Sequence, residues 1–159
     1  MTRVVALVLL VLFAVAACGS GSSTPSESVG VFMTRILREE INGQWSQQWT
    51  ELHPAHQKLI SRAQYVACSQ KMGTNIGSGK EKFHILDVED QAIHVQGVPQ
   101  KTAKLVTISF TEPGASPLTY RLHAVNVSGR WAWVLGDRFL AQVDHGRCLD
   151  GTPLAHATS

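Results

Sequence analysis

Five side chains in the C-terminal half of the chain have the chemistry to exchange a proton with a substrate: His84, Asp87, His94, Tyr120 and His123. An imidazole can act as a general base near neutral pH. His84 and His94 fall in neighbouring segments with strand character, so a hairpin between those segments would bring them together. A surface or hydrogen-bonded strand histidine is nevertheless the commoner outcome. We therefore assign no catalytic residue and keep His84 and His94 only as weak candidates for a base.

Two other stretches approach a metal or phosphate motif without completing it. His53 and His56 are three residues apart, but no glutamate follows His53 as it does in the His-Glu-x-x-His zinc motif. The glycine-rich segment 73–80 ends in Gly79-Lys80, yet Glu81 stands where a Walker loop has serine or threonine. The sequence therefore predicts no metal site and no cofactor.

The first eighteen residues carry the most specific pattern in the chain. Arg3 precedes an apolar run from Val4 to Val15, which is followed by two alanines and Cys18. A basic start, an apolar core and small residues before a cut are typical of a secretory signal. The apolar run is too short to serve as a permanent membrane-spanning helix.

The segment Val15-Ala16-Ala17-Cys18 resembles the lipobox of bacterial lipoproteins. The resemblance implies that residues 1–17 are removed, that a diacylglycerol is attached to the Cys18 thiol, and that the new amino end is usually acylated. Membrane lipid is then the partner of Cys18, and the protein lies on the extracytoplasmic face of the bacterial cell membrane. Each buried methylene contributes about 0.8 kcal/mol, so several acyl chains hold a protein stably. The alternative is an ordinary cleavable signal or an uncleaved anchor.

The remainder of the chain divides into a linker, one domain and a tail. Residues 18–26 are rich in glycine and serine and are expected to form a flexible linker. Residues 27–148 have the size of one ordinary domain. Residues 149–159 show no hydrophobic periodicity, so we expect a loosely ordered tail.

Composition and charge argue against a nucleic-acid partner. The chain has 14 Lys and Arg residues against 12 Asp and Glu residues, whereas nucleic-acid binding calls for a clustered basic face. No polybasic run adjoins Cys18 to suggest electrostatic binding to lipid. The apolar fraction of 44% includes the signal but is still sufficient for one core.

Cys68 and Cys148 are the two cysteines that remain once Cys18 carries lipid. Export to an oxidising compartment favours one disulfide between them. Two separate thiols are the alternative.

The segment between residues 26 and 72 has helical periodicity. An apolar stripe predicts a first helix, with Ser26 or Ser28 as its cap and Asn42-Gly43 as its stop; its apolar residues are Val29, Phe32, Met33, Ile36, Leu37 and Ile41. Shorter helices are expected from Trp45, after His53-Pro54, and from the capping box Ser61-Arg62-Ala63-Gln64. The last of these helices should end near Lys71 or Met72.

Alternating β-branched residues after Lys80 predict an antiparallel sheet. Polar Glu89-Asp90-Gln91 suggests a hairpin between Phe83–Val88 and Ala92–Val98. Further strands are expected at Lys104–Phe110, at Leu118–Val127 and, after a Ser128-Gly129 turn, around Trp131 to Leu135. Helices followed by an antiparallel meander predict an α+β fold, with the helices packed on one face of a curved sheet.

The order of elements, with the segment Gly43-Gln44-Trp45-Ser46-Gln47-Gln48-Trp49-Thr50-Glu51-Leu52-His53-Pro54, resembles the NTF2-like superfamily. The resemblance covers roughly Ser28 to Cys148. It implies a cystatin-like cone, in which helices and a curved sheet enclose a cavity. Some members are isomerases or dehydratases, whereas others are binding modules, including extracytoplasmic domains of lipoproteins and transpeptidases. No Tyr/Asp pair here reproduces the spacing of the isomerase site.

Four tryptophans are candidates to line such a cavity, with the core as the alternative: Trp45, Trp49, Trp131 and Trp133. We favour a non-enzymatic module of the cell envelope that binds a small apolar ligand or a protein partner. The alternative is an enzyme that performs acid/base chemistry on an apolar substrate in the cone, with His84 or His94 as the base.

Overall fold

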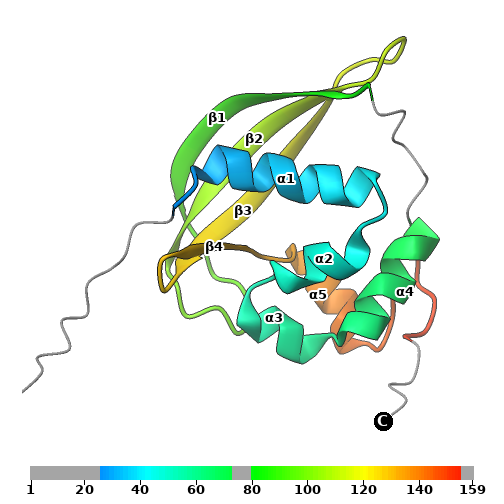
Figure 1. Ribbon diagram of the computed structural model, residues 1–159. Coiled ribbons are helices and arrows are strands. Elements are labelled where there is room, and N and C mark those ends of the chain that lie inside the picture. Colours follow the sequence, from blue (N-terminus) through cyan, green and yellow to red (C-terminus); the bar gives the residue numbers. More distant parts are fainter. Residues whose placement is uncertain (1–25, 73–79, 155–159) are drawn as a thin grey trace, which may run out of the picture.

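The computed structural model describes residues 26–72 and 80–154 (Figure 1). The predicted signal, Cys18, most of the linker, segment 73–79 and the last five residues lie outside the described residues. The fold is α+β, as predicted, with helices followed by a curved antiparallel sheet. Its elements are α1 (Val29–Ile41), α2 (Trp45–Thr50), α3 (Pro54–Leu59), α4 (Arg62–Met72), β1 (Lys82–Ala92), β2 (Thr102–Thr111), β3 (Leu118–Val127), β4 (Arg130–Trp133) and α5 (Asp137–Asp144).

Helix α1 begins and ends at the residues that the sequence indicates. The Ser28 hydroxyl accepts a hydrogen bond from the Val31 backbone N–H at 3.3 Å, which confirms Ser28 as the cap. Gly43 follows the helix at a φ of 67°, a left-handed conformation that glycine adopts at little cost. The apolar stripe of α1 is buried against the sheet.

The capping box before α4 is also confirmed. The Ser61 hydroxyl accepts a hydrogen bond from the Gln64 N–H at 3.3 Å, and the Gln64 side-chain oxygen accepts one from the Ser61 N–H at 3.0 Å. Pro54 opens α3, where the imidazole of His53 accepts a hydrogen bond from the Ala55 N–H at 3.1 Å. These local signals set where the short helices start.

The sheet is antiparallel with the strand order β1-β2-β3-β4, and it curves around α1 (Figure 1). Ser128 and Gly129 have φ values of 51° and 83° and join β3 to β4 in the predicted tight turn. The outer edge of β4 is covered, since Trp133 exchanges backbone hydrogen bonds with Glu51 and His53 at 3.1 and 2.8 Å. Strand β1 forms the opposite edge.

The predicted hairpin within residues 83–98 is wrong. Strand β1 continues through Glu89-Asp90-Gln91 and pairs along its length with β2, from Lys82 opposite Thr111 to Ala92 opposite Thr102. The polar run needs no turn because it lies on an edge strand that is open to solvent. The Asp90 carboxylate forms a salt bridge with the Lys104 Nζ, 2.7 Å away, on the neighbouring strand β2.

The sheet carries apolar clusters on both faces. The main core lies between α1 and the inner face of the sheet, and it contains Phe32, Met33, Ile36, Val106 and Ile108. A second, smaller cluster lies on the other face, where the segment between β1 and β2 covers the strands; its members are Ile93, Val98, Ala103, Val125, Ala132 and Val134. This second layer was not predicted.

Helix α5, which the sequence analysis missed, packs Phe139, Leu140 and Val143 into the core. A disulfide joins Cys68 of α4 to Cys148, just after α5, and this is the pairing that export favours. Residues 149–154, part of the expected tail, close a turn in which the Leu154 N–H donates to the Gly146 carbonyl at 2.8 Å.

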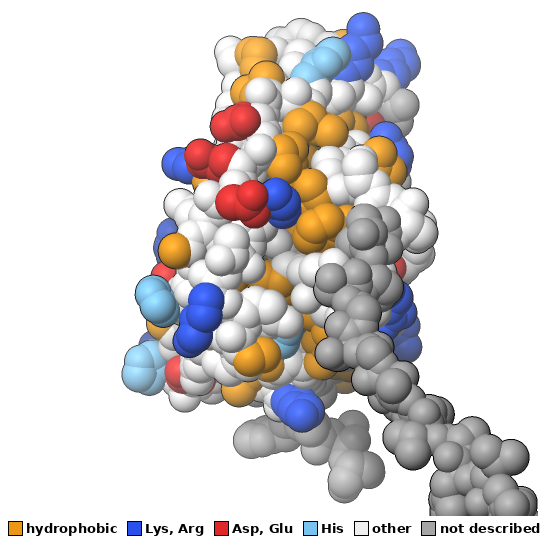
Figure 2. Space-filling view, turned by 90° about the vertical axis from the view of Figure 1, so that its left-hand side faces the viewer, with side chains coloured by type: hydrophobic (Ala, Val, Ile, Leu, Met, Phe, Trp, Pro, Cys, Tyr) orange, Lys and Arg blue, Asp and Glu red, His pale blue; other side chains and the backbone are white. Residues whose placement is uncertain are grey.

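The side of the molecule at the edge strand exposes hydrophobic side chains between charged ones (Figure 2). Val31 of α1 and Ile85, Leu86 and Val88 of β1 are all exposed. A β-bulge interrupts the pairing of β1 between Ile85 and Asp87.

Within residues 26–72 and 80–154, none of the helices combines the length and the apolar character that crossing a membrane requires.

Candidate functional site

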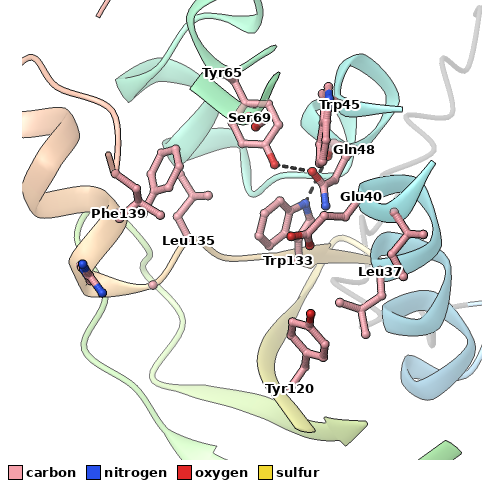
Figure 3. Close-up of a pocket in the computed structure, with 14 residues that line it drawn as sticks. Leu37, Glu40, Trp45, Gln48, Tyr65, Ser69, Tyr120, Trp133, Leu135 and Phe139 are labelled. Atoms are coloured by element: carbon pink, nitrogen blue, oxygen red, sulfur yellow. Dashed lines mark hydrogen bonds between the residues drawn. The ribbon is translucent and has the colours of Figure 1, made fainter. Parts of the chain in front are cut away.

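A cavity of about 320 Å³ lies where six elements of the fold converge (Figure 3). Helices α1, α2, α4 and α5 and strands β3 and β4 all contribute lining residues, which include Leu37, Glu40, Ile41, Trp45, Gln48, Tyr65, Ser69, Tyr120, Trp133, Leu135, Gly136, Arg138, Phe139 and Leu149. The walls are mainly aliphatic and aromatic, with a small number of polar groups among them. That composition is characteristic of small-molecule sites.

The polar end of the cavity is organised by Gln48, whose side chain is buried. The Tyr65 hydroxyl donates a hydrogen bond to the Gln48 Oε1, and the Gln48 Nε2 donates to the Ile36 carbonyl at 3.3 Å. The Trp133 Nε1 donates to the backbone carbonyl of Gln48 at 3.1 Å. Because the amide both accepts and donates a hydrogen bond, its orientation is fixed and it holds the Tyr65 ring in place, while the backbone carbonyl of Gln48 holds Trp133.

Glu40 supplies a carboxylate to the cavity from the last turn of α1 (Figure 3). Solvent reaches this side chain through the open cavity, and the residue as a whole is exposed. The surrounding walls still remove part of its hydration, and this burial raises the pKa of Glu40, while a hydrogen bond from Gln48 opposes the rise. Burial and then the charge of Glu40 raise the pKa values of Tyr65 and Tyr120.

The four candidate tryptophans divide into two pairs. Trp45 and Trp133 line the cavity. Trp49 instead donates a hydrogen bond to the Ile60 carbonyl at 3.0 Å, and Trp131 donates to the Glu27 carbonyl at 2.9 Å. Trp49 and Trp131 therefore support the surrounding structure, although Trp131 also borders a smaller cavity of about 100 Å³.

The structure does not bring His84 and His94 together. His84 lies near the start of β1 and His94 lies just beyond its end, so most of the length of the strand lies between them. Both residues are exposed, and neither lines the cavity. The hairpin that would have paired them does not form, and neither imidazole is among the lining residues of the two cavities described here.

The other proton-exchange candidates also lie apart from the cavity, with the exception of Tyr120. His123 is on the outer face of the sheet, where its Nε2 hydrogen-bonds the Gln91 side chain, and burial lowers its pKa. Asp87 is exposed, and its carboxylate accepts a hydrogen bond from the Val88 N–H at 2.8 Å. The Asp87 contact is local and the His123 contact joins β3 to β1, and both are structural contacts of strand residues.

His56 is fully buried and connects three segments. Its Nδ1 accepts a hydrogen bond from the Leu135 N–H at 3.0 Å, so its Nε2 carries the proton and donates to the Gln96 carbonyl at 3.3 Å. Burial lowers the pKa of His56. Leu135 lines the cavity, so the neutral imidazole fixes one of its walls.

Metal ligation finds no support in residues 26–72 and 80–154, where no three His, Cys, Asp or Glu side chains are grouped to hold an ion. His53 and His56, which the sequence brings near each other, each make the backbone hydrogen bonds described above.

Four polar residues of the cavity were not among the site residues predicted from sequence: Glu40, Gln48, Tyr65 and Ser69. Glu40 follows Ile36 by four positions and Leu37 by three, so the periodicity of the first helix already placed it next to the buried stripe. Gln48 follows Trp45 by three positions in the same way. The convergence of α4 and α5 on these residues depends on tertiary packing.

Comparisons of this chain with protein-family models, with curated proteins and with solved structures find no match.

Proposed function

We propose that this chain is a lipoprotein, anchored through Cys18 on the extracytoplasmic face of a bacterial membrane, whose NTF2-like domain binds a small and largely apolar ligand. The observation that carries the binding function is the cavity lined by Trp45, Tyr120, Trp133 and Phe139. The anchor is supported by the lipobox-like segment that ends at Cys18.

The NTF2-like architecture is supported by the arrangement of the elements. Helix α1 crosses the inner face of a curved antiparallel sheet, and the shorter helices close one end of the space beneath it (Figure 1). The cavity lies at the end of α1, where a cone-shaped member of that superfamily would hold its ligand.

The size and lining of the cavity suit a small molecule. Its volume of about 320 Å³ is near the lower limit of the 300 to 1,000 Å³ common for ligand pockets. Buried hydrogen bonds hold Trp133 and Tyr65 in place before any ligand arrives, so little ordering is needed on binding.

Indole, a neutral aromatic probe, should bind the full-length protein in lipid nanodiscs and shift the side-chain N–H resonances of Trp45 and Trp133. Gly136→Leu should abolish the shifts because Gly136 lines the cavity, has a negative φ and leaves open space around an added side chain. Ser116→Leu, which places the same leucine side chain in the exposed β2–β3 turn, should bind indole normally. Shifts that persist in Gly136→Leu would place the binding site elsewhere.

The anchor can be tested by fractionation of cells that express the wild type or Cys18→Ser. We expect the wild type to remain with membranes through salt and carbonate washes and to acquire the mass of the attached acyl chains. Cys18→Ser should lack that mass and should not remain as the processed, membrane-bound form. A processed Cys18→Ser protein that resists both washes would contradict lipid anchoring at this residue.

A further inference from the structure

We propose that the ligand is a small amphipathic amine, whose ammonium group pairs with Glu40 while its apolar part lies against the aromatic walls of the cavity. This inference rests on the proposed ligand-binding function and specifies the chemical class of the ligand. It is carried by the position of one carboxylate among apolar rings.

Glu40 is an acid without an ion-pair partner in the part of the chain that the structure describes. The salt bridges there join Arg35 to Glu27, Glu39 and Glu51, and join other pairs on the sheet, but none includes Glu40. Its neighbour Glu39 is buried and bound by Arg35 at 3.4 Å. The carboxylate that faces the cavity is therefore the one whose charge is left for a ligand.

The neighbouring polar groups of the cavity already have hydrogen-bond partners. Tyr65 donates to Gln48, Ser69 hydrogen-bonds Tyr65, and the Gln48 amide donates to Ile36 and Glu40. The Gln48 amide thus occupies one acceptor position of the Glu40 carboxylate, and the remaining lone pairs can accept hydrogen bonds from a ligand. An acceptor with a negative charge favours a positively charged donor.

The rings beside Glu40 add a second preference for a cation. Trp45, Tyr65, Tyr120 and Trp133 all contribute to the cavity lining (Figure 3). Aromatic faces attract ammonium groups electrostatically and also bury alkyl chains. A carboxylate surrounded by such rings suits a molecule with a cationic head and an apolar body.

Arg138 is the group in the cavity lining that would favour a negatively charged ligand. It lies in the first turn of α5 and is exposed, although it also lines the cavity. Figure 3 shows the Glu40 carboxylate beside the Trp133 ring, whereas Arg138 joins the cavity lining from α5. Among the charged groups, Glu40 has the largest effect on the pKa values of Tyr65 and Tyr120. A ligand seated against the rings therefore meets the negative charge, and a carboxylic acid is the competing class.

Three water-soluble six-carbon probes separate these classes: hexylamine, hexanol and hexanoate. Each is titrated at pH 7.5 into the full-length protein in nanodiscs, with the tryptophan N–H resonances as the readout. Hexylamine is protonated at this pH and should bind about tenfold more tightly than hexanol, as one charge-assisted contact provides. Glu40→Gln should remove that preference, so that hexylamine binds no more tightly than hexanol to the variant. Glu112→Gln, which removes an acid outside the cavity lining, should keep the preference.

The outcomes distinguish this inference from the proposed function beneath it. The amine assignment is overturned if hexanol or hexanoate binds as tightly as hexylamine or more tightly. It is also overturned if the preference for hexylamine survives in Glu40→Gln. Either result leaves the cavity as a binding site. Failure of all three probes and of indole overturns both the assignment and the proposed binding function.

Discussion

Replacing Cys68 and Cys148 together with alanine is expected to lower the free energy of unfolding by about 4 kcal/mol, the largest single effect predicted for this domain. The two cysteines are 80 residues apart, so the bond restricts a long loop in the unfolded chain. The bond also ties α4 to the segment that follows α5, and both helices line the cavity. We therefore expect weaker indole binding as well as lower stability.

Urea unfolding of the oxidised wild type, the reduced wild type and the double variant measures this effect. The reduced wild type and the variant should unfold at similar, lower urea concentrations. Peptide mapping by mass spectrometry without reduction should recover Cys68 joined to Cys148. Two free thiols in the oxidised protein, or equal midpoints for all three samples, would show that the bond does not stabilise the fold.

His56→Ala is expected to cost about 3 kcal/mol of stability. The variant leaves the Leu135 N–H and the Gln96 carbonyl without their partner and opens a space in a fully buried position. Exposed His84 supplies the matched control, because His84→Ala removes an imidazole from the surface of β1 and should change stability very little. A similar loss in both variants would indicate that the contacts of His56 are unimportant.

The same burial predicts how stability depends on pH. The folded pKa of His56 lies below its ordinary value of 6.5, so below about pH 6.5 the unfolded state binds more protons than the folded state. The contribution of His56 to the free energy of unfolding should therefore be fully present above pH 6.5. It should decrease as the pH falls toward the folded pKa. Burial also lowers the pKa values of His53 and His123, which act in the same direction.

Unfolding followed by circular dichroism between pH 5 and pH 8 tests this dependence. The slope of stability against pH should be smaller in His56→Ala than in the wild type, whereas His84→Ala should retain the full slope. An unchanged slope in His56→Ala would assign the pH dependence to other groups.

The helices that precede the sheet were predictable from sequence because their limits are set by local chemistry, whereas α5 was missed. Ser28 and the Ser61–Gln64 pair satisfy backbone donors within a few residues, and Gly43 permits the left-handed stop. These interactions need no distant partner. For the same reason, the turn at Ser128-Gly129 was correctly placed between two alternating segments.

The errors arose where a distant part of the chain decides the outcome. Asp90 resembles a turn residue, but a salt bridge to Lys104 and the open side of an edge strand accommodate it within β1. Ile93 and Val98 continue the β-like pattern, yet they fold over the outer face of the sheet. The local pattern of residues around Asp90, Ile93 and Val98 does not reveal that Lys104 or the outer face of the sheet will be in contact with them.

The candidate site was predicted only in part for a related reason. Trp45 and Trp133 were identified because large aromatic residues are conspicuous in sequence. Glu40 and Gln48 resemble ordinary polar residues of surface helices until α4 and α5 pack around them. A cavity is a property of how elements meet, so its polar members are the least visible from sequence.

Strand β1 has a consequence for how copies of this protein behave when they are crowded. An edge strand presents backbone donors and acceptors on which a second chain could polymerise. Here a bulge between Ile85 and Asp87 breaks the regular edge, and charged side chains follow it, with Asp87 beside the ion-paired Glu89 and Asp90. The bulge and the charged side chains therefore oppose edge-to-edge pairing of β1 between two copies, the step by which an open sheet edge leads to polymers.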